Sequence, residues 1–328
     1  MSSPELLPWQ HDTWTHLQSA LGRLPHSLLF SGPVGLGKNR FAQRFATSLL
    51  CESPAEDGTP CGTCKSCHLI SVGNHPDFRI TSIEEDATGI AVDQVRGLIS
   101  YLSLRPHTSS RRVVILTPAE AMNINAANSL LKVLEEPPAD SVLILVSHRP
   151  QLLSATIRSR CARIEFRPPS SADAADWLQR EGVKREAIPD LLAAAGGAPL
   201  RAAELSQLGF AQAQKMMLAD LQALQTGAGD PVECAVRWKE MGAEFCLSWF
   251  SGLLADLIQT GSVEEEKGRH LNNPSLGKSL GFLAVNTRAE QLFGLLDQVV
   301  ESTRLAKTPL DDTLLIEDIL IGWCKTGI

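Results

Sequence analysis

A glycine-rich loop near the N-terminus constrains the fold of this chain more than any other segment. It has the sequence SGPVGLGKN and spans residues 31–39. The loop matches the phosphate-binding pattern G-x-x-x-x-G-K-[ST] up to its last position. Gly32, Gly37 and Lys38 are in place, whereas Asn39 stands where a hydroxyl group would hold magnesium. The loop therefore predicts a nucleotide-binding scaffold in which one magnesium ligand has been replaced.

The segments on either side of the loop support this interpretation. Residues 26–30 form a short apolar run that predicts a buried strand, and residues 40–50 carry apolar side chains four apart, which predicts a helix. Glycines let successive backbone amides point inward and cradle an anion at a helix N-terminus. We expect Lys38 to reach the outer phosphates of ATP or ADP. The predicted nucleotide-binding residues of the loop are Gly32, Gly35, Gly37, Lys38 and Asn39.

Four of the eight cysteines form a cluster with the spacing C-x9-C-x2-C-x2-C. In a cytoplasmic chain such a cluster indicates a metal site rather than a disulfide framework. Four thiolates can complete a tetrahedral zinc shell without an open catalytic position, so we expect a structural role. His68 abuts the cluster and could replace one ligand, although a fourth cysteine is the simpler choice. The predicted zinc ligands are Cys51, Cys61, Cys64 and Cys67.

Length and composition set the broad class of the protein. A chain of 328 residues can form two or three domains with substantial cores, and 44% apolar with 20% charged residues is ordinary for globular proteins. We find neither an apolar run of membrane-spanning length nor a signal segment, so we expect a soluble, cytoplasmic protein without a membrane partner. The net charge of −7 provides no global attraction for nucleic acid, so a DNA contact would need a local patch or a partner protein.

The chain alternates strands and helices up to about residue 168 and is helical afterwards. Residues 78–80 predict the next strand, and apolar runs at 113–116 and 142–146 predict further buried strands, and hence a parallel sheet covered on both faces. A Pro-Pro-Ser-Ser linker follows at 168–171, in which Ser171 is the predicted N-cap of the next helix.

Two breaks divide the helical part of the sequence. A small helical unit extends to about residue 208, and from there only helical periodicity remains, broken near residues 227–229 and 272–274. Three glutamates at 264–266 are typical of a solvated face or loop.

Two later motifs make the pattern specific. NSLLKVLEEPP at 128–138 resembles the hallmark helix of the clamp-loader subunits of bacterial DNA polymerase III, which are AAA+ proteins. The sequence SRC at 159–161 is similar to their Ser-Arg-Cys motif, and the insert at 51–67 matches their zinc module. These motifs span about residues 26–201, whereas the helical C-terminus fits the family only by length and class.

The resemblance implies a three-part architecture. It consists of a RecA-like α/β P-loop domain at 1–168 with its zinc-binding insert, a small helical lid at 169–208, and an all-α collar for oligomerisation at 209–328.

The place of a second magnesium ligand is also altered relative to this family. Active members carry Asp-Glu after the apolar strand, where the Asp orients magnesium and the Glu polarises the attacking water. Here Thr117 and Pro118 occupy those positions, and Glu120 comes two residues too late unless a bent strand end brings it back. Together with Asn39, this implies that hydrolysis has been abandoned, while Lys38 and the loop amides remain available to bind ATP or ADP.

The same resemblance gives Arg160 the role of an arginine finger that acts in trans on a neighbouring gamma/tau ATP site. Arg158 competes for this role, and a local ion pair with a carboxylate is the structural alternative for Arg160. Ser147 fits the family's first sensor position and Arg201 its second, nucleotide-contacting sensor. Lys132 lies on the hallmark helix with two glutamates, either on a solvated face or close enough to contact a DNA backbone.

The function implied is that of a stationary ring subunit without ATPase activity of its own. It would belong to a DNA-directed DNA polymerase holoenzyme, a nucleotidyltransferase complex. Its expected partners are the gamma/tau and delta subunits and, through the complex, the sliding clamp and primer-template DNA. One alternative is an active gamma/tau-type motor ATPase, and another is an ATP-regulated adaptor outside replication. Copurification with gamma/tau and delta would distinguish the stationary ring subunit from the adaptor outside replication.

Overall fold

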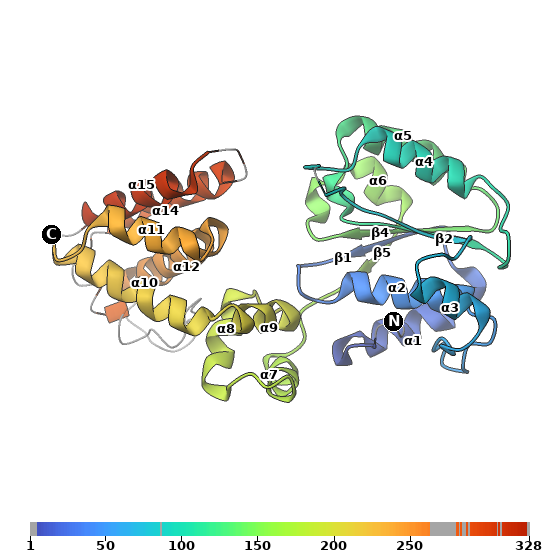
Figure 1. Cartoon of the computed structure of the whole chain (residues 1–328), viewed down its shortest axis with the longest axis horizontal. Coiled ribbons are helices and arrows are strands. Elements are labelled where there is room, and N and C mark those ends of the chain that lie inside the picture. Colours follow the sequence, from blue (N-terminus) through green and yellow to red (C-terminus); the bar gives the residue numbers. More distant parts are fainter. Residues whose placement is uncertain are drawn as a thin grey trace. The chain divides into compact units, whose positions relative to one another are not determined.

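Figure 1 shows a computed structural model of the chain, which describes residues 5–85, 87–262, 280–281, 283, 287, 289–306, 308 and 310–326. Internal contacts divide the chain into two compact units, Met1–Pro169 and Ser170–Ile328. The division falls inside the Pro-Pro-Ser-Ser linker. The features predicted at 264–266 and 272–274 lie outside the described residues.

A five-stranded parallel sheet forms the centre of the first unit. The strand order is β2-β3-β4-β1-β5, and each neighbouring pair is parallel. The strands are β1 (Ser27–Ser31), β2 (Phe78–Thr81), β3 (Arg112–Leu116), β4 (Ser141–Ser147) and β5 (Ala162–Glu165). Because all strands run the same way, their carboxyl ends meet at one edge of the sheet, where ligands bind in open α/β folds. The predicted parallel sheet is confirmed, with β1, β3 and β4 buried, whereas β2 lies at the sheet edge and exposes Arg79 and Ile80.

Helices cover both faces of this sheet, as its apolar strands require. In Figure 1, α1, α2 and α3 lie on one face and α4, α5 and α6 on the other. These helices are α1 (His11–Ser19), α2 (Lys38–Leu50), α3 (Lys65–Ser71), α4 (Val92–Leu102), α5 (Ile124–Glu135) and α6 (Ala155–Arg160). Short 3₁₀ turns complete the unit: η1 (Pro8–Gln10), η2 (Leu21–Arg23), η3 (Ala119–Ala121) and η4 (Pro150–Leu152).

An aromatic cluster fixes α2 against the sheet. The ring of Phe41 on α2 meets Phe30 of β1 edge-on and lies 5.0 Å from the ring centroid of Phe166. Trp14 of α1 packs edge-on against Phe41 and Phe45. Edge-to-face packing of this kind adds to the stabilisation from burial alone, so the helix that follows the glycine loop is held rigidly.

The second unit is helical throughout its described residues. Its helices are α7 (Ser171–Arg180), α8 (Ile188–Ala194), α9 (Pro199–Gln207), α10 (Phe210–Gln225), α11 (Pro231–Glu240), α12 (Ala243–Ser262), α14 (Ala289–Leu305) and α15 (Asp312–Cys324), with a 3₁₀ turn η5 (Arg185–Ala187). One continuous cluster of buried apolar side chains runs from Ala174 to Trp323. The indole of Trp323 donates to the carbonyl of Leu221, 2.9 Å away, which ties α15 to α10.

One capping prediction was wrong by a residue. Ser170, rather than Ser171, is the N-cap of α7, because its hydroxyl accepts a hydrogen bond from the backbone N–H of Asp173. Ser171 is the first residue of the helix.

Within the described residues, no single helix has the length and apolar character needed to cross a membrane. The helices Pro231–Glu240 and Ala243–Thr260 meet that test only when taken together, and they are bent by 117° at the break between them.

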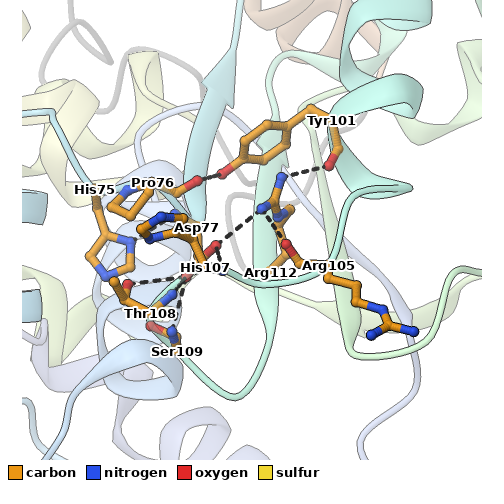
Figure 2. Close-up of polar contacts among 9 residues, drawn as sticks. All are labelled: His75, Pro76, Asp77, Tyr101, Arg105, His107, Thr108, Ser109 and Arg112. Atoms are coloured by element: carbon orange, nitrogen blue, oxygen red, sulfur yellow. Dashed lines mark hydrogen bonds and ion pairs between the residues drawn. The ribbon is translucent and has the colours of Figure 1, made fainter.

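A buried ion pair fixes one end of the sheet (Figure 2). The carboxylate of Asp77, which is fully buried, accepts hydrogen bonds from the backbone N–H groups of His107, Thr108 and Ser109 at 2.7–2.9 Å. It also accepts a hydrogen bond from the hydroxyl of Thr108 at 3.1 Å and pairs with the Nη2 of Arg112 at 3.2 Å. The guanidinium of Arg112 also lies over the ring of Tyr101, 4.3 Å from its centroid. The network therefore joins the start of β2, the end of α4 and the loop before β3.

Replacing Asp77 by asparagine should lower the free energy of unfolding by about 3–5 kcal/mol, because Arg112 would be left as an uncompensated buried charge. The matched control is Asp93→Asn, since Asp93 also pairs with an arginine but is 85% exposed. That change should cost less than about 0.5 kcal/mol. Urea denaturation of both variants provides the measurement, and equal losses would contradict the assigned role of the buried pair.

The same network makes a pH-dependent contribution. Burial by itself raises the pKa of Asp77, but the hydrogen bonds from the loop amides outweigh it and hold the pKa at about 2. This value lies below that of an aspartate in an unfolded chain, about 3.9. The stabilisation is therefore complete above about pH 4 and is lost as the pH falls towards 2, so the difference between native and Asp77→Asn proteins should shrink over that interval.

Candidate functional site

The glycine loop connects β1 to α2 at the carboxyl edge of the sheet. Gly37 is the N-cap of α2 and has a left-handed backbone, with φ of 78°. Gly32 has φ of 146°, and a Cβ there would lie 2.2 Å from the carbonyl oxygen of Phe166. Both positions therefore require glycine for the backbone that they adopt. Gly35 also has a positive φ, of 83°.

The loop is held by groups of its own chain. The carbonyl oxygen of Leu36 accepts hydrogen bonds from the indole of Trp9, at 3.1 Å, and from the amide of Gln10, at 2.9 Å. The ammonium group of Lys38 donates to the carbonyl of Pro33, within the same loop. The short turn η1 before α1 thus closes over the loop and fixes its shape.

The two altered magnesium positions are in direct contact. The hydroxyl of Thr117, just after β3, donates a hydrogen bond of 2.7 Å to the side-chain oxygen of Asn39, at the start of α2. Magnesium sites in nucleotide-binding proteins rely on a carboxylate and a hydroxyl at these two places. Here a neutral amide and a neutral hydroxyl satisfy each other, and the anionic ligand is missing from its usual position.

Glu120 does not stand in for the missing anionic magnesium ligand, because its carboxylate is engaged in other hydrogen bonds. Its Oε1 accepts hydrogen bonds from the backbone N–H groups of His148, at 2.9 Å, and Arg149, at 3.1 Å, beyond the end of β4. Burial raises the pKa of Glu120, but these and other hydrogen bonds outweigh it, so the pKa lies below its usual value. The carboxylate therefore stabilises the turn after β4.

The charge of Glu120 also acts on Lys38. Lys38 is 2% exposed, and its burial lowers its pKa to about 8, with the negative charge of Glu120 opposing part of that shift. Burial also lowers the pKa of His148, and the positive charge of Lys38 lowers it further. The lysine thus remains mostly cationic at neutral pH and available to an anionic ligand.

The four clustered cysteines have the geometry of a tetrahedral metal site. Their Sγ atoms all lie within 4.8 Å of one another. The measured separations are 3.6 Å for Cys51 to Cys61, 3.7 Å for Cys51 to Cys67, 3.9 Å for Cys51 to Cys64 and 4.0 Å for Cys61 to Cys67. A zinc ion with Zn–S distances of 2.3 Å requires Sγ atoms about 3.8 Å apart. The donor set therefore fits zinc and is far too widely spaced for disulfides.

Backbone N–H groups orient the sulfur atoms. The N–H of Cys61 points to the Sγ of Cys51 at 3.4 Å, and the N–H of Cys64 points to the Sγ of Cys61 at 3.3 Å. Hydrogen bonds from the backbone of Thr63 and Cys64 lower the pKa of Cys61 to about 5, which favours the thiolate that binds metal. His68, the alternative ligand, is exposed and does not belong to the cluster.

Arg160 is the last residue of α6, a short helix capped by Ser154. Its Nη2 lies 2.7 Å from the Oε1 of Glu135, at the end of α5, and its Nη1 donates to the carbonyl of Thr156 at 3.1 Å. The Arg160 side chain is 35% exposed, whereas Cys161 beside it is buried. The Ser-Arg-Cys motif thus anchors its cysteine in the core and leaves its arginine at the surface.

Two family models together match most of the chain. The model described as DNA polymerase III, delta subunit, matches residues 9–170, and the one described as DNA polymerase III, delta subunit, C terminal, matches residues 209–325. The DNA polymerase III subunit delta' of Pseudomonas aeruginosa is 34% identical over 327 residues, which cover 98% of each chain. The chain belongs to the DNA polymerase III delta' family.

Two further comparisons agree with this membership. The delta' subunit of Escherichia coli K12 is 29% identical over 96% of this chain and 94% of its own length. A gamma subunit-related protein of Thermotoga maritima has a TM-score of 0.52 at 17% identity, covering 97% of this chain and 99% of that one, which shows the fold alone. As a member of the delta' family, the chain is a clamp-loader subunit, and the AAA+ fold predicted from its motifs is confirmed.

The remaining predicted positions in this delta' chain differ in their surroundings. Ser147 is fully buried at the end of β4, and its carbonyl accepts a hydrogen bond from the N–H of Gly32 at 3.3 Å. Arg201 on α9 forms an ion pair of 3.1 Å with Glu204, one turn further along the helix. Lys132 is exposed on α5. Their roles as sensors or DNA contacts remain predictions.

Sequence reasoning missed three contacts of this site. It named a local carboxylate as the alternative partner of Arg160, and the structure has that ion pair, but it did not identify Glu135 as the residue that forms it. It noted the two altered magnesium positions without foreseeing that Asn39 and Thr117 bond to each other. The contact of Trp9 with the glycine loop had no signal in the sequence, because it depends on how η1 lies over the sheet edge.

Proposed function

We propose that this chain is the stationary, ATPase-inactive member of the clamp-loader ring. The observation that carries the proposal is the hydrogen bond between Asn39 and Thr117, which replaces both side-chain magnesium ligands by neutral groups. Without a bound metal, the charge that develops on a transferred phosphoryl group lacks its main stabilisation. The same observation weighs against an active gamma/tau-type motor.

Arg160 would carry the catalytic contribution that is left to a subunit without hydrolysis of its own. Its exposed guanidinium, at the end of a capped helix, is available to a neighbouring subunit, as an arginine finger must be. Arg158 is the weaker candidate because its contact with the carbonyl of Pro150 is long, at 3.5 Å, and within the described residues it forms no ion pair with a carboxylate. We infer that Arg160 completes the ATP site of a neighbouring gamma/tau subunit.

The resulting complex would contain gamma/tau and delta subunits. On this proposal it opens the sliding clamp and places it on primer-template DNA during replication, and the chain contacts both through the complex. Residues 169–208 would act as the lid and residues 209–328 as the collar that joins the ring. The cysteine cluster would hold a structural zinc ion. An adaptor role outside replication would require a chain that does not copurify with gamma/tau and delta.

The glycine loop would bind ATP or ADP without hydrolysing it. Its positive-φ glycines direct amides towards an anion, and Lys38 keeps its place at the start of α2. Gly32, Gly35, Gly37, Lys38 and Asn39 would line this site. Arg201 would contact the nucleotide only after its ion pair with Glu204 breaks.

Replacing Lys38 by alanine should abolish nucleotide binding to the isolated chain and leave the ATPase rate of the reconstituted complex unchanged. Binding depends on the charge of Lys38, whereas turnover belongs to the neighbouring subunits. Equilibrium dialysis with ADP and ATP, and steady-state hydrolysis with clamp and primed DNA, are the two measurements. A strong fall in turnover for Lys38→Ala would mean that the loop is catalytic and that the chain is a motor. If the unmodified chain binds neither ADP nor ATP, the proposed nucleotide site is wrong.

A further inference from the structure

The ion pair between Arg160 and Glu135 joins the two motifs that identify the family. Glu135 belongs to the LEEPP end of α5, and Arg160 is the arginine of the Ser-Arg-Cys motif at the end of α6. The pair is short, at 2.7 Å, and the second anchor of the guanidinium, the carbonyl of Thr156, comes from its own helix. Two different elements therefore fix the direction of one side chain.

We propose that Glu135 is a positioning residue that orders the guanidinium of Arg160 for its action on the neighbouring ATP site. This inference rests on the proposed finger role of Arg160. Glu135 would make no contact with nucleotide. It would act only by restricting the rotamers of the arginine before the neighbouring subunit's phosphates arrive.

The pair is suited to orientation rather than to folding stability. The side chains of Arg160 and Glu135 are 35% and 52% exposed, and an exposed ion pair contributes little to stability. The interaction therefore adds little to folding stability, whereas a long, flexible arginine gains a defined direction from it.

The geometry leaves the arginine able to act while it is held. A guanidinium group carries five N–H donors. Nη1 donates to the carbonyl of Thr156, and Nη2 is ion-paired with the carboxylate of Glu135, so further N–H groups remain for phosphate oxygens. Arg160 could therefore meet an anion on the neighbouring subunit without leaving either anchor.

Glu136 provides a control for the role of Glu135. Glu136 follows Glu135 directly and is also exposed, yet the ion pairs formed by the described residues do not include it. Glu136→Ala is thus a matched control for Glu135→Ala, since it removes the same charge one residue away. Glu135→Gln keeps a side-chain oxygen that can accept from Arg160 and should retain part of the effect.

The test uses the reconstituted complex of this chain with gamma/tau and delta. The readout is the phase of ATP hydrolysis that disappears in Arg160→Ala. We expect Glu135→Ala to lower kcat of that phase by about tenfold, in keeping with the rotamer freedom that the arginine regains. The KM for ATP should stay unchanged because the neighbour's own loop binds the nucleotide. Glu135→Gln should fall between Glu135→Ala and the unmodified chain, and Glu136→Ala should match the latter.

A double variant separates positioning from a general structural effect. If Glu135 acts through Arg160, then adding Glu135→Ala to Arg160→Ala should cause no further loss. Thermal unfolding and copurification of each variant check that the chain folds and assembles. Unchanged or faster turnover in Glu135→Ala would overturn the inference while the finger role stands. Unchanged turnover in Arg160→Ala would instead overturn the proposed function itself.

Discussion

Replacing Arg160 by alanine is expected to remove one phase of ATP hydrolysis from the complex reconstituted with gamma/tau and delta. At the site that Arg160 completes, the rate should fall by about 10³- to 10⁵-fold, the range for arginine fingers in related phosphoryl-transfer systems. The cause is the loss of a positive charge placed against the charge that develops on the transferred phosphoryl group. The burst of phosphate release, measured with clamp and primed DNA, should shrink by the share of that single site.

Arg158→Ala is the matched control for this experiment. Arg158 lies two residues earlier on α6, and its Nη1 reaches the carbonyl of Pro150 at 3.5 Å. Its loss should leave the burst intact, because the ion pairs among the described residues do not include Arg158, whereas Glu135 pairs with Arg160. If Arg158→Ala were the damaging change and Arg160→Ala were harmless, the finger would have to be reassigned.

Removing the metal should have the second large effect, on the stability of the insert. Structural zinc contributes about 10–16 kcal/mol of apparent binding energy in zinc-finger peptides at neutral pH. The segment around the four cysteines contains only one helix, α3, and Cys67 is its only buried thiol ligand. We therefore expect a strong chelator to unfold this segment and expose it to protease while the sheet survives.

The loss should extend to the N-terminal helix. The indole of Trp14 on α1 donates to the carbonyl of Asp57, at 2.8 Å, and Ser48 on α2 donates to the carbonyl of Gly58, at 2.6 Å. Both carbonyls belong to the cysteine insert. Hydrogen exchange should therefore show faster opening of α1 after chelation.

Cysteine variants provide the control for the chelation experiment. Cys67→Ser should eliminate bound zinc, measured by elemental analysis, and lower the melting temperature. Cys324→Ser should change neither, because Cys324 is exposed and lies far along the chain in α15. One zinc ion per chain is expected in the unmodified protein. A zinc-free protein that is as stable before as after treatment with chelator would show that the four thiols serve another purpose.

The elements of the first unit could be predicted from sequence because their signals are local. The apolar runs of β3 and β4 have no polar alternation, which is typical of strands buried on both faces. The cysteine spacing predicted a four-ligand cluster because short loops bring such residues together. The finger role of Arg160 came from motif resemblance alone, and its place at the end of α6 was not predicted.

Contacts between distant segments could not be predicted in this way. Asn39 and Thr117 are separated by 78 residues and meet only because β3 and β1 flank β4 in the same parallel sheet. The role of Asp77 had no local signal, since the three amides that bind it come from a loop about thirty residues later. The cap at Ser170 was missed because two adjacent serines offer the same side chain, and only the backbone conformation selects between them.

The neutral pair at Asn39 and Thr117 has a consequence for the timing of the ring. An active site of this class changes its local charge whenever a metal-bound phosphate arrives or departs, and the segments around it move in response. A site whose magnesium positions hold a mutually bonded amide and hydroxyl undergoes no such change of charge. On the proposed role, this subunit therefore keeps one conformation while its neighbours bind and hydrolyse ATP. The hydrolysing subunits then always have the same unchanging neighbour at one position of the ring. That position gives the successive hydrolysis steps a defined starting point and order.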